Sequence, residues 1–131
     1  MRPEDVPVLA LLRQSIGFNA QRQRVIAENV ANANTPGYTA RDLDQDAFHQ
    51  ALQEQLQARR TGNGGLNMRS GSREWSTINS PDSETTVNGN SVVLEEQMVR
   101  SNETRLQYET ALSLYQKSLG LMRMAVKSPG R

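Results

Sequence analysis

The side chains that could take part in catalysis or metal binding are few, and they are not clustered. His49 is the only histidine in the chain, and a single imidazole without a group of carboxylates is more often a surface residue than a base or a metal ligand. Asp42, Asp44 and Asp46 alternate as the first ligands of a Ca²⁺ loop do, but the glycine and the distal glutamate of such a loop are missing. We expect these aspartates to cap and charge the start of a helix instead.

Two further patterns also lack what their chemistry requires. Ser70, Ser72 and Ser76 have no base partner, so the sequence gives no support to hydrolase chemistry. The Gly-rich run at residues 62–65 has neither the lysine nor the flanking strand and helix of a phosphate-binding loop. The chain contains no cysteine, which excludes thiolate nucleophiles, disulfides and Cys-based metal sites. The sequence therefore predicts no catalytic residues, no metal and no cofactor, and so a protein that is not an enzyme.

Length and charge point to one small domain with a thin core. The chain has 131 residues, of which 36% are hydrophobic and 5% aromatic, so we expect part of its apolar surface to be buried against other chains. Its net charge is +1, from 15 basic and 14 acidic residues, which argues against a nucleic-acid or anionic-lipid partner. No apolar run approaches the ~20 residues of a membrane span. The short apolar run at 6–12 contains Pro7 and leads to no cleavage site, so we expect no cleaved signal peptide.

The first segment, residues 1–43, is expected to hold a helix over about 7–33. Pro7 suits the first helical turn, where its missing N–H is no loss. Apolar residues follow at steps of three and four, although Asn19 and Gln23 interrupt this stripe and Gly17 weakens its middle. The residues that we expect to pack in this seam are Leu9, Leu12, Ile16, Ile26 and Val30.

The last segment, residues 92–131, carries the clearest helical pattern in the sequence. Alternate steps of four and three residues from Leu94 reach mostly apolar side chains, as in a seam that faces a partner helix. The stripe broadens over 111–126, which is typical of a helix buried on more than one side, and Pro129 with Gly130 ends it. The residues expected to pack in this seam are Leu94, Met98, Tyr108, Leu112, Tyr115, Leu119, Met122 and Val126.

Between these two helices lie a short helix and a polar stretch. Residues 44–60 place Phe48, Leu52 and Leu56 at four-residue steps, which predicts an amphipathic helix. Residues 61–91 are rich in Gly, Ser, Thr and Asn, so we expect a mobile loop or a surface that orders on contact, with Trp75 and Ile78 as its anchors. The predicted fold is all-α: the terminal helices pair as a coiled-coil-like hairpin and also pack against neighbouring subunits.

The end of the first helix has a definite local geometry. Thr35 precedes a proline and is therefore pushed out of helical geometry, so the helix should stop at about Asn34. Asn32 or Asn34 can adopt the left-handed cap conformation. Pro36 and Gly37 fit the two central positions of a type II turn, which needs a positive φ at the glycine. Tyr38 would then point back toward the helix end. The turn motif therefore comprises Asn32, Asn34, Thr35, Pro36, Gly37 and Tyr38.

Two strings in the sequence resemble a known family. Residues 29–42, NVANANTPGYTARD, resemble the N-terminal signature of flagellar rod, hook and distal rod proteins, and their continuation is similar to the proximal rod proteins lettered B. Residues 88–98, NGNSVVLEEQM, are similar to the second signature of those proximal rod proteins. The local chemistry of the second string predicts a turn at Asn88 and Gly89, then an N-cap at Asn90 or Ser91.

The second string departs from the family at Val93, where aspartate is common. The first departs at Thr39, where lysine is common. The departure at Val93 affects the cap of the last helix.

The resemblance implies a structural subunit of the flagellar basal body, in the periplasmic rod that transmits torque. It further implies export through the flagellar type III pathway, and helical assembly with copies of itself, other rod proteins and the basal-body ring and export gate. Two alternatives stay open: a sibling rod or hook protein, and a soluble coiled-coil adaptor or export chaperone.

Overall fold

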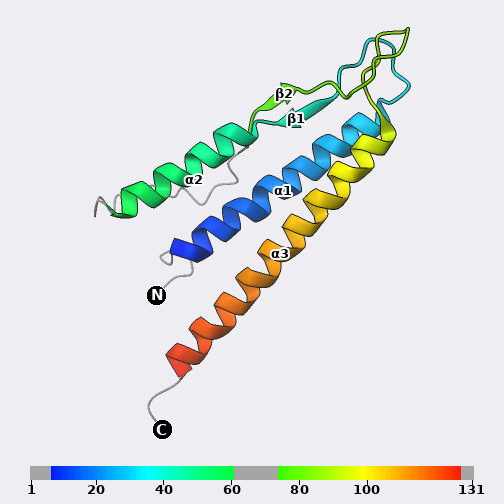
Figure 1. Cartoon of the computed structure of the whole chain (residues 1–131). Coiled ribbons are helices and arrows are strands. Elements are labelled where there is room, and N and C mark those ends of the chain that lie inside the picture. Colours follow the sequence, from blue (N-terminus) through cyan, green and yellow to red (C-terminus); the bar gives the residue numbers. More distant parts are fainter. Residues whose placement is uncertain (1–6, 61–73, 128–131) are drawn as a thin grey trace.

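The computed structural model describes residues 7–60 and 74–127 and consists mainly of helices. Its elements are α1 (Pro7–Ala31), β1 (Arg41–Leu43), α2 (Gln45–Arg60), β2 (Thr77–Asn79) and α3 (Leu94–Lys127). In Figure 1, α1 and α3 run in opposite directions side by side, and α2 lies on the other side of α1. The predicted all-α class and the hairpin of terminal helices are confirmed. The two strands, which the sequence did not predict, form one short antiparallel ribbon.

The ends of the helices follow from capping chemistry. Asp44 precedes α2, and its Oδ1 accepts a hydrogen bond from Ala47 N at 3.0 Å, so Asp44 is an N-cap as expected. Asp46 lies in the first turn of the same helix. The first helix ends at Ala31, about three residues before the position predicted from the proline.

The main cluster of buried apolar side chains joins α1 to β1 and α2. It is formed by Phe18, Val25, Leu43, Phe48, Ala51 and Trp75. Phe18 and Phe48 stack with ring centroids 4.1 Å apart, and the ring of Trp75 is nearly perpendicular to both. The prediction that Trp75 anchors the middle segment is confirmed.

The return of the chain through residues 74–91 is held by polar contacts as well as by this tryptophan. Gln21 binds the backbone of Trp75 twice, since its Nε2 donates to Trp75 O at 2.7 Å and its Oε1 accepts from Trp75 N at 2.8 Å. Ile78, the second predicted anchor, is 47% exposed on β2, so that prediction was wrong. Because β2 has only three residues, its sequence shows no alternation of apolar and polar side chains from which a buried face could be predicted. The rest of the predicted loop, residues 61–73, lies outside the described residues.

Candidate functional site

We call residues 32–38, which follow α1, the corner, and this segment contains the type II turn that its sequence predicts. Gly37 has a φ of 72°, and Tyr38 N donates to Thr35 O at 3.2 Å, which closes the turn around Pro36 and Gly37. Neither Asn32 nor Asn34 is left-handed, because the positive φ values in the described chain are all at glycine. That prediction was wrong. The last turn of the helix instead contains 3₁₀-type hydrogen bonds between residues three apart, such as Asn32 N to Asn29 O at 3.2 Å. These bonds satisfy the terminal carbonyl groups without a left-handed cap.

Asn29 is the centre of the hydrogen bonds at the corner. Its side chain is fully buried, and its Nδ2 donates to Arg41 O at 2.7 Å and to Gln97 Oε1 at 3.0 Å. Its Oδ1 accepts from the Tyr38 hydroxyl and from Arg41 N, each at 3.0 Å. Both amide protons and the carbonyl of Asn29 are therefore used, as a buried amide requires. Tyr38 points back onto the helix end, as predicted.

The second signature, residues 88–98, packs against the first, residues 29–42, through hydrogen bonds. Asn90 is buried, and its Nδ2 donates to Asn32 O at 2.9 Å and to Thr35 O at 2.7 Å. The hydroxyl of Ser91 accepts from Ala40 N at 3.0 Å. Neither residue caps α3, so the predicted N-cap at Asn90 or Ser91 was wrong. Both side chains satisfy backbone groups of the corner instead.

Two glycines allow the two signatures to touch. Gly37 N donates to Asn88 O at 2.8 Å. Gly89 has a φ of 80° and closes a turn on Thr86, as predicted for Asn88 and Gly89. A Cβ atom on Gly89 would lie 3.3 Å from Gly37 Cα, so the contact leaves little room for a side chain.

The carboxylate of Asp82, in the segment between β2 and α3, accepts hydrogen bonds from the start of α3. Val93 occupies the cap position and offers no capping side chain, since the first helical bond runs from Gln97 N to Val93 O at 3.0 Å. Asp82 Oδ2 accepts from Val93 N and from Gln97 Nε2, each at 2.8 Å, while Oδ1 pairs with Arg100 at 3.2 Å. The negative charge thus lies at the positive end of the helix dipole.

Glu96, in the first turn of α3, holds the same loop from the helix side. The hydroxyl and N–H of Ser83 donate to its carboxylate, and these bonds lower the pKa of Glu96. Nothing in the sequence pattern identified Asp82 or Ser83, because both lie in the stretch that reads as polar loop.

A buried ion pair joins α1 to β1. Arg22 Nε and its terminal nitrogen donate to the two oxygens of Asp42 at 3.0 and 3.1 Å, and both side chains are buried. Asp42 was expected to cap and charge the start of a helix, and that expectation was wrong, because the residue lies in β1 and pairs with Arg22. Its Oδ1 also accepts from Leu43 N at 2.7 Å, so the carboxylate is held on both sides.

The predicted packing residues divide into buried, half-buried and exposed groups. In the first seam Leu9 and Ile26 are buried, Leu12 and Ile16 are half-buried, and Val30 is exposed. In the second seam the half-buried residues are Tyr108, Leu112, Tyr115, Leu119 and Met122, and the exposed residues are Leu94, Met98 and Val126.

The residues of α3 that are buried are Gln97, Thr104 and Ala111. The face turned to α1 is therefore offset from the predicted stripe by about one residue. Polar contacts select this face: Gln97 bonds to Asn29, and Gln23 Nε2 donates to Ser101 O at 3.1 Å.

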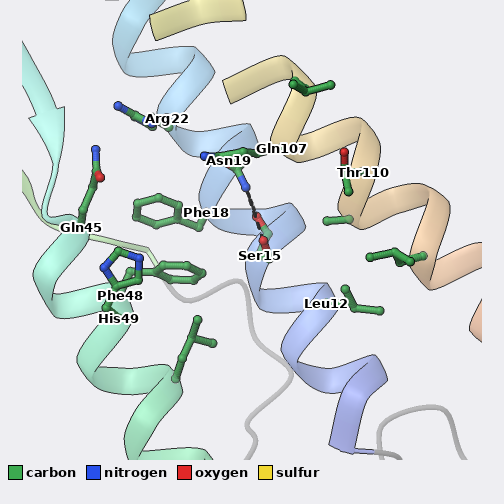
Figure 2. A pocket seen from close by; sticks show the side chains of 14 residues that line it. Leu12, Ser15, Phe18, Asn19, Arg22, Gln45, Phe48, His49, Gln107 and Thr110 are labelled. Carbon is green, nitrogen blue, oxygen red and sulfur yellow. Dashed lines mark hydrogen bonds between the residues drawn. The ribbon is translucent and has the colours of Figure 1, made fainter. Parts of the chain in front are cut away.

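A groove of about 560 Å³ opens over α1 between α2 and α3. Figure 2 shows Phe18 and Phe48 between α1 and α2, with Leu12 and Thr110 on the side toward α3. His49, which we expected on the surface, lies at the edge of this groove. The described residues include no group of three or more His, Cys, Asp or Glu side chains that could hold a metal. None of the helices in residues 7–60 and 74–127 is long and apolar enough to cross a membrane.

Comparison with known proteins places these features in context. The family described as "Flagella basal body rod protein" matches residues 19–39, from the middle of α1 to the corner. The flagellar basal body rod protein FlgB of Agrobacterium fabrum is 36% identical over 128 residues, which cover 95% of this chain and 96% of that protein. FlgB of Escherichia coli is 29% identical over 80% of this chain and 82% of its own length. FlgB of Salmonella typhimurium is 28% identical over 87% of this chain and 89% of its own length.

Proposed function

The chain belongs to the FlgB family of flagellar basal body rod proteins, and from this premise we propose that it is a structural subunit of the proximal rod. The family is one of structural proteins of the bacterial flagellum. The observation that carries the proposal is the near full-length relation to the protein of Agrobacterium fabrum, which covers 95% of this chain.

The distribution of apolar surface supports assembly with other chains. Among the described residues, most of the exposed large apolar side chains lie on α3. Exposed apolar side chains gathered on one helix are typical of an interaction site. In the described part of the chain, Val30, Leu94, Met98 and Val126 of the predicted seams are 44–76% exposed, and they would pack against neighbouring subunits.

The half-buried seam residues would complete their burial in the same way. Leu112 and Leu119 lie on the side of α3 next to the face that meets α1. A neighbouring helix laid along that side would bury them fully. Repeated contacts of this heterologous kind generate a helical tube.

The finer parts of the proposal concern place and partners. The subunit would be exported by the flagellar type III pathway without a cleaved signal peptide and would lie in the periplasmic rod. Its partners would be copies of itself, other rod proteins, and the basal-body ring and export gate. Membership of the family disfavours the adaptor or export chaperone that the sequence alone left open.

A deletion strain tests the proposal. Cells that lack the chain should build no rod and should not swim, and the full-length chain supplied in trans should restore both. Mass spectrometry of purified basal bodies should find the chain in the rod fraction of the complemented strain. Normal rods in the deletion strain would overturn the proposal.

A further inference from the structure

One side of α3 carries a stripe of exposed residues that is symmetric about its centre. We name it the α3 side stripe, and it consists of Val99, Glu103, Leu106, Thr110, Leu114, Lys117 and Leu121, all of which are exposed. Its steps average about 3.67 residues per turn, close to the 3.6 of an α-helix, so the stripe runs nearly straight. It lies roughly 120° around the helix axis from the residues that face α1.

The chemistry of the stripe is self-complementary when one copy is reversed. Thr110 is its midpoint, and the residues equally distant from this midpoint are Leu106 and Leu114, Glu103 and Lys117, and Val99 and Leu121. An antiparallel second copy therefore places apolar side chains opposite apolar side chains and each acid opposite a base. A parallel copy in the same register places Glu103 opposite Glu103 and Lys117 opposite Lys117, which is unfavourable.

In the part of the chain that the structure describes, the charges of the stripe form no ion pair, and its apolar members are about half exposed or more. The ion pairs found in residues 7–60 and 74–127 involve neither Glu103 nor Lys117. The four large apolar members are between 48% and 68% exposed. Figure 1 shows α3 at one edge of the molecule, with α1 between it and α2.

The middle of the stripe also forms one wall of the groove described above. Leu106, Thr110 and Leu114 line the groove from α3, and Phe18 and Phe48 line it from α1 and α2. A helix laid along the stripe therefore also covers the mouth of this groove, whose mixed lining includes Phe18, Phe48, Leu106 and Leu114. This adds apolar contact to the contact between the stripes.

We propose that two copies of the chain associate through their α3 side stripes as an antiparallel pair. The two-fold axis passes beside Thr110, and two equivalent contacts form between Glu103 of one copy and Lys117 of the other. The two partner leucines, at 106 and 114, pack across the axis and close the mouth of each groove.

The pair has a consequence that rests on the proposed function. A two-fold contact uses the same surface on both subunits and closes on itself, whereas a tube grows through contacts that do not close. The antiparallel pair is therefore a stored form outside the rod, and it must separate before a subunit joins the growing end.

Engineered cysteines test the geometry, since the full-length chain has none of its own. Thr110→Cys should form a disulfide-linked dimer under mild oxidation at least about tenfold faster than Gln116→Cys, which is exposed on another side of α3. A mixture of Val99→Cys and Leu121→Cys should yield the mixed dimer. Equal rates for Thr110→Cys and Gln116→Cys, or mainly self-linked Val99→Cys, would overturn the proposal.

Charge reversal tests the energetics in the unmodified full-length chain. Sedimentation equilibrium should show a dimer, and either Glu103→Lys or Lys117→Glu should raise its dissociation constant about tenfold, because two contacts become repulsive. The double variant should return to within about threefold of the original value. A strictly monomeric chain, or a dimer indifferent to these reversals, would refute the pair.

The test is independent of the proposed function. A monomeric chain that still restores motility overturns the pair alone. A dimer in a chain that the rod does not need supports the pair and overturns the proposed function.

Discussion

A side chain at position 37 would be unfavourable because of the backbone conformation there, not because of a steric clash with neighbours. A Cβ atom there would meet nothing within 4 Å, but φ is +72°. Gly37→Val should therefore lower the free energy of unfolding by about 1–3 kcal/mol, whereas Gly37→Asn should be milder, because asparagine tolerates the left-handed region. Urea denaturation of both variants measures the difference. Equal stability of the two variants would show that the turn does not need a positive φ.

The two charged residues of β1, Arg41 and Asp42, should differ sharply in their contributions to the free energy of unfolding. Asp42→Ala leaves Arg22 buried without its partner and should cost about 3–5 kcal/mol. Arg41 has an exposed side chain, so Arg41→Ala should cost about 0–1 kcal/mol. Urea denaturation compares the two variants directly. A stable Asp42→Ala variant would mean that the ion pair does not persist in solution.

Tyr38 should give the corner a response to alkaline pH. Burial raises the pKa of Tyr38 above its ordinary 10.0, Arg41 opposes this shift, and Glu28 adds to it. A raised pKa means that the unfolded chain releases this proton first, so stability is complete below pH 10 and falls as pH rises through the folded pKa. Tyr38→Phe should flatten that fall, and Tyr115→Phe should not. Identical pH profiles for the original chain and Tyr38→Phe would contradict this reading.

At the scale of elements, the sequence predicted the helices better than the contacts between them. The three helices, the type II turn and the cap at Asp44 follow from local rules that a single sequence displays. The face of α3 that meets α1 depends on Asn29 and Gln97, which are 68 residues apart, and no local rule relates them. Ile78 and Asp42 were misplaced for a similar reason, since their burial is set by a short ribbon with little periodicity.

The second half of α3 should be its less stable part in isolation. The fully buried residues of this helix end at Ala111, and the residues that follow are half-buried or exposed. In dilute monomer, hydrogen exchange should be faster beyond residue 112 than near Gln97 and Asn29. Uniform protection along all of α3 would contradict this, and the comparison should be made below the concentration at which any dimer forms.

At the scale of the whole molecule, a carboxylate in the α3 seam should block assembly but not export. Leu119 is half-buried in the chain and would be fully buried in the proposed rod. Leu119→Asp should therefore cost several kcal/mol in the assembled state, while an unfolded chain in transit barely senses it. Asn102→Asp, an added charge at an exposed position, is the control. The measurement is the amount of exported subunit against the number of rods, and normal rods with Leu119→Asp would remove Leu119 from the seam.

The polar corner also fixes when the chain can finish folding. Its hydrogen bonds join Asn29 to Gln97 and Asn32 to Asn90, over 68 and 58 residues of sequence. Such non-local pairs carry a large loop-closure cost and form slowly. A chain that emerges with its N-terminus first cannot form the hydrogen bond between Asn29 and Gln97 until Gln97 has also emerged. The arrival of α3 therefore sets the time at which the hydrogen bonds of Asn29 are complete. The nearby partners of the first helix, such as Tyr38 and Arg41, follow soon after it, but Gln97 arrives only when about three-quarters of the subunit has emerged.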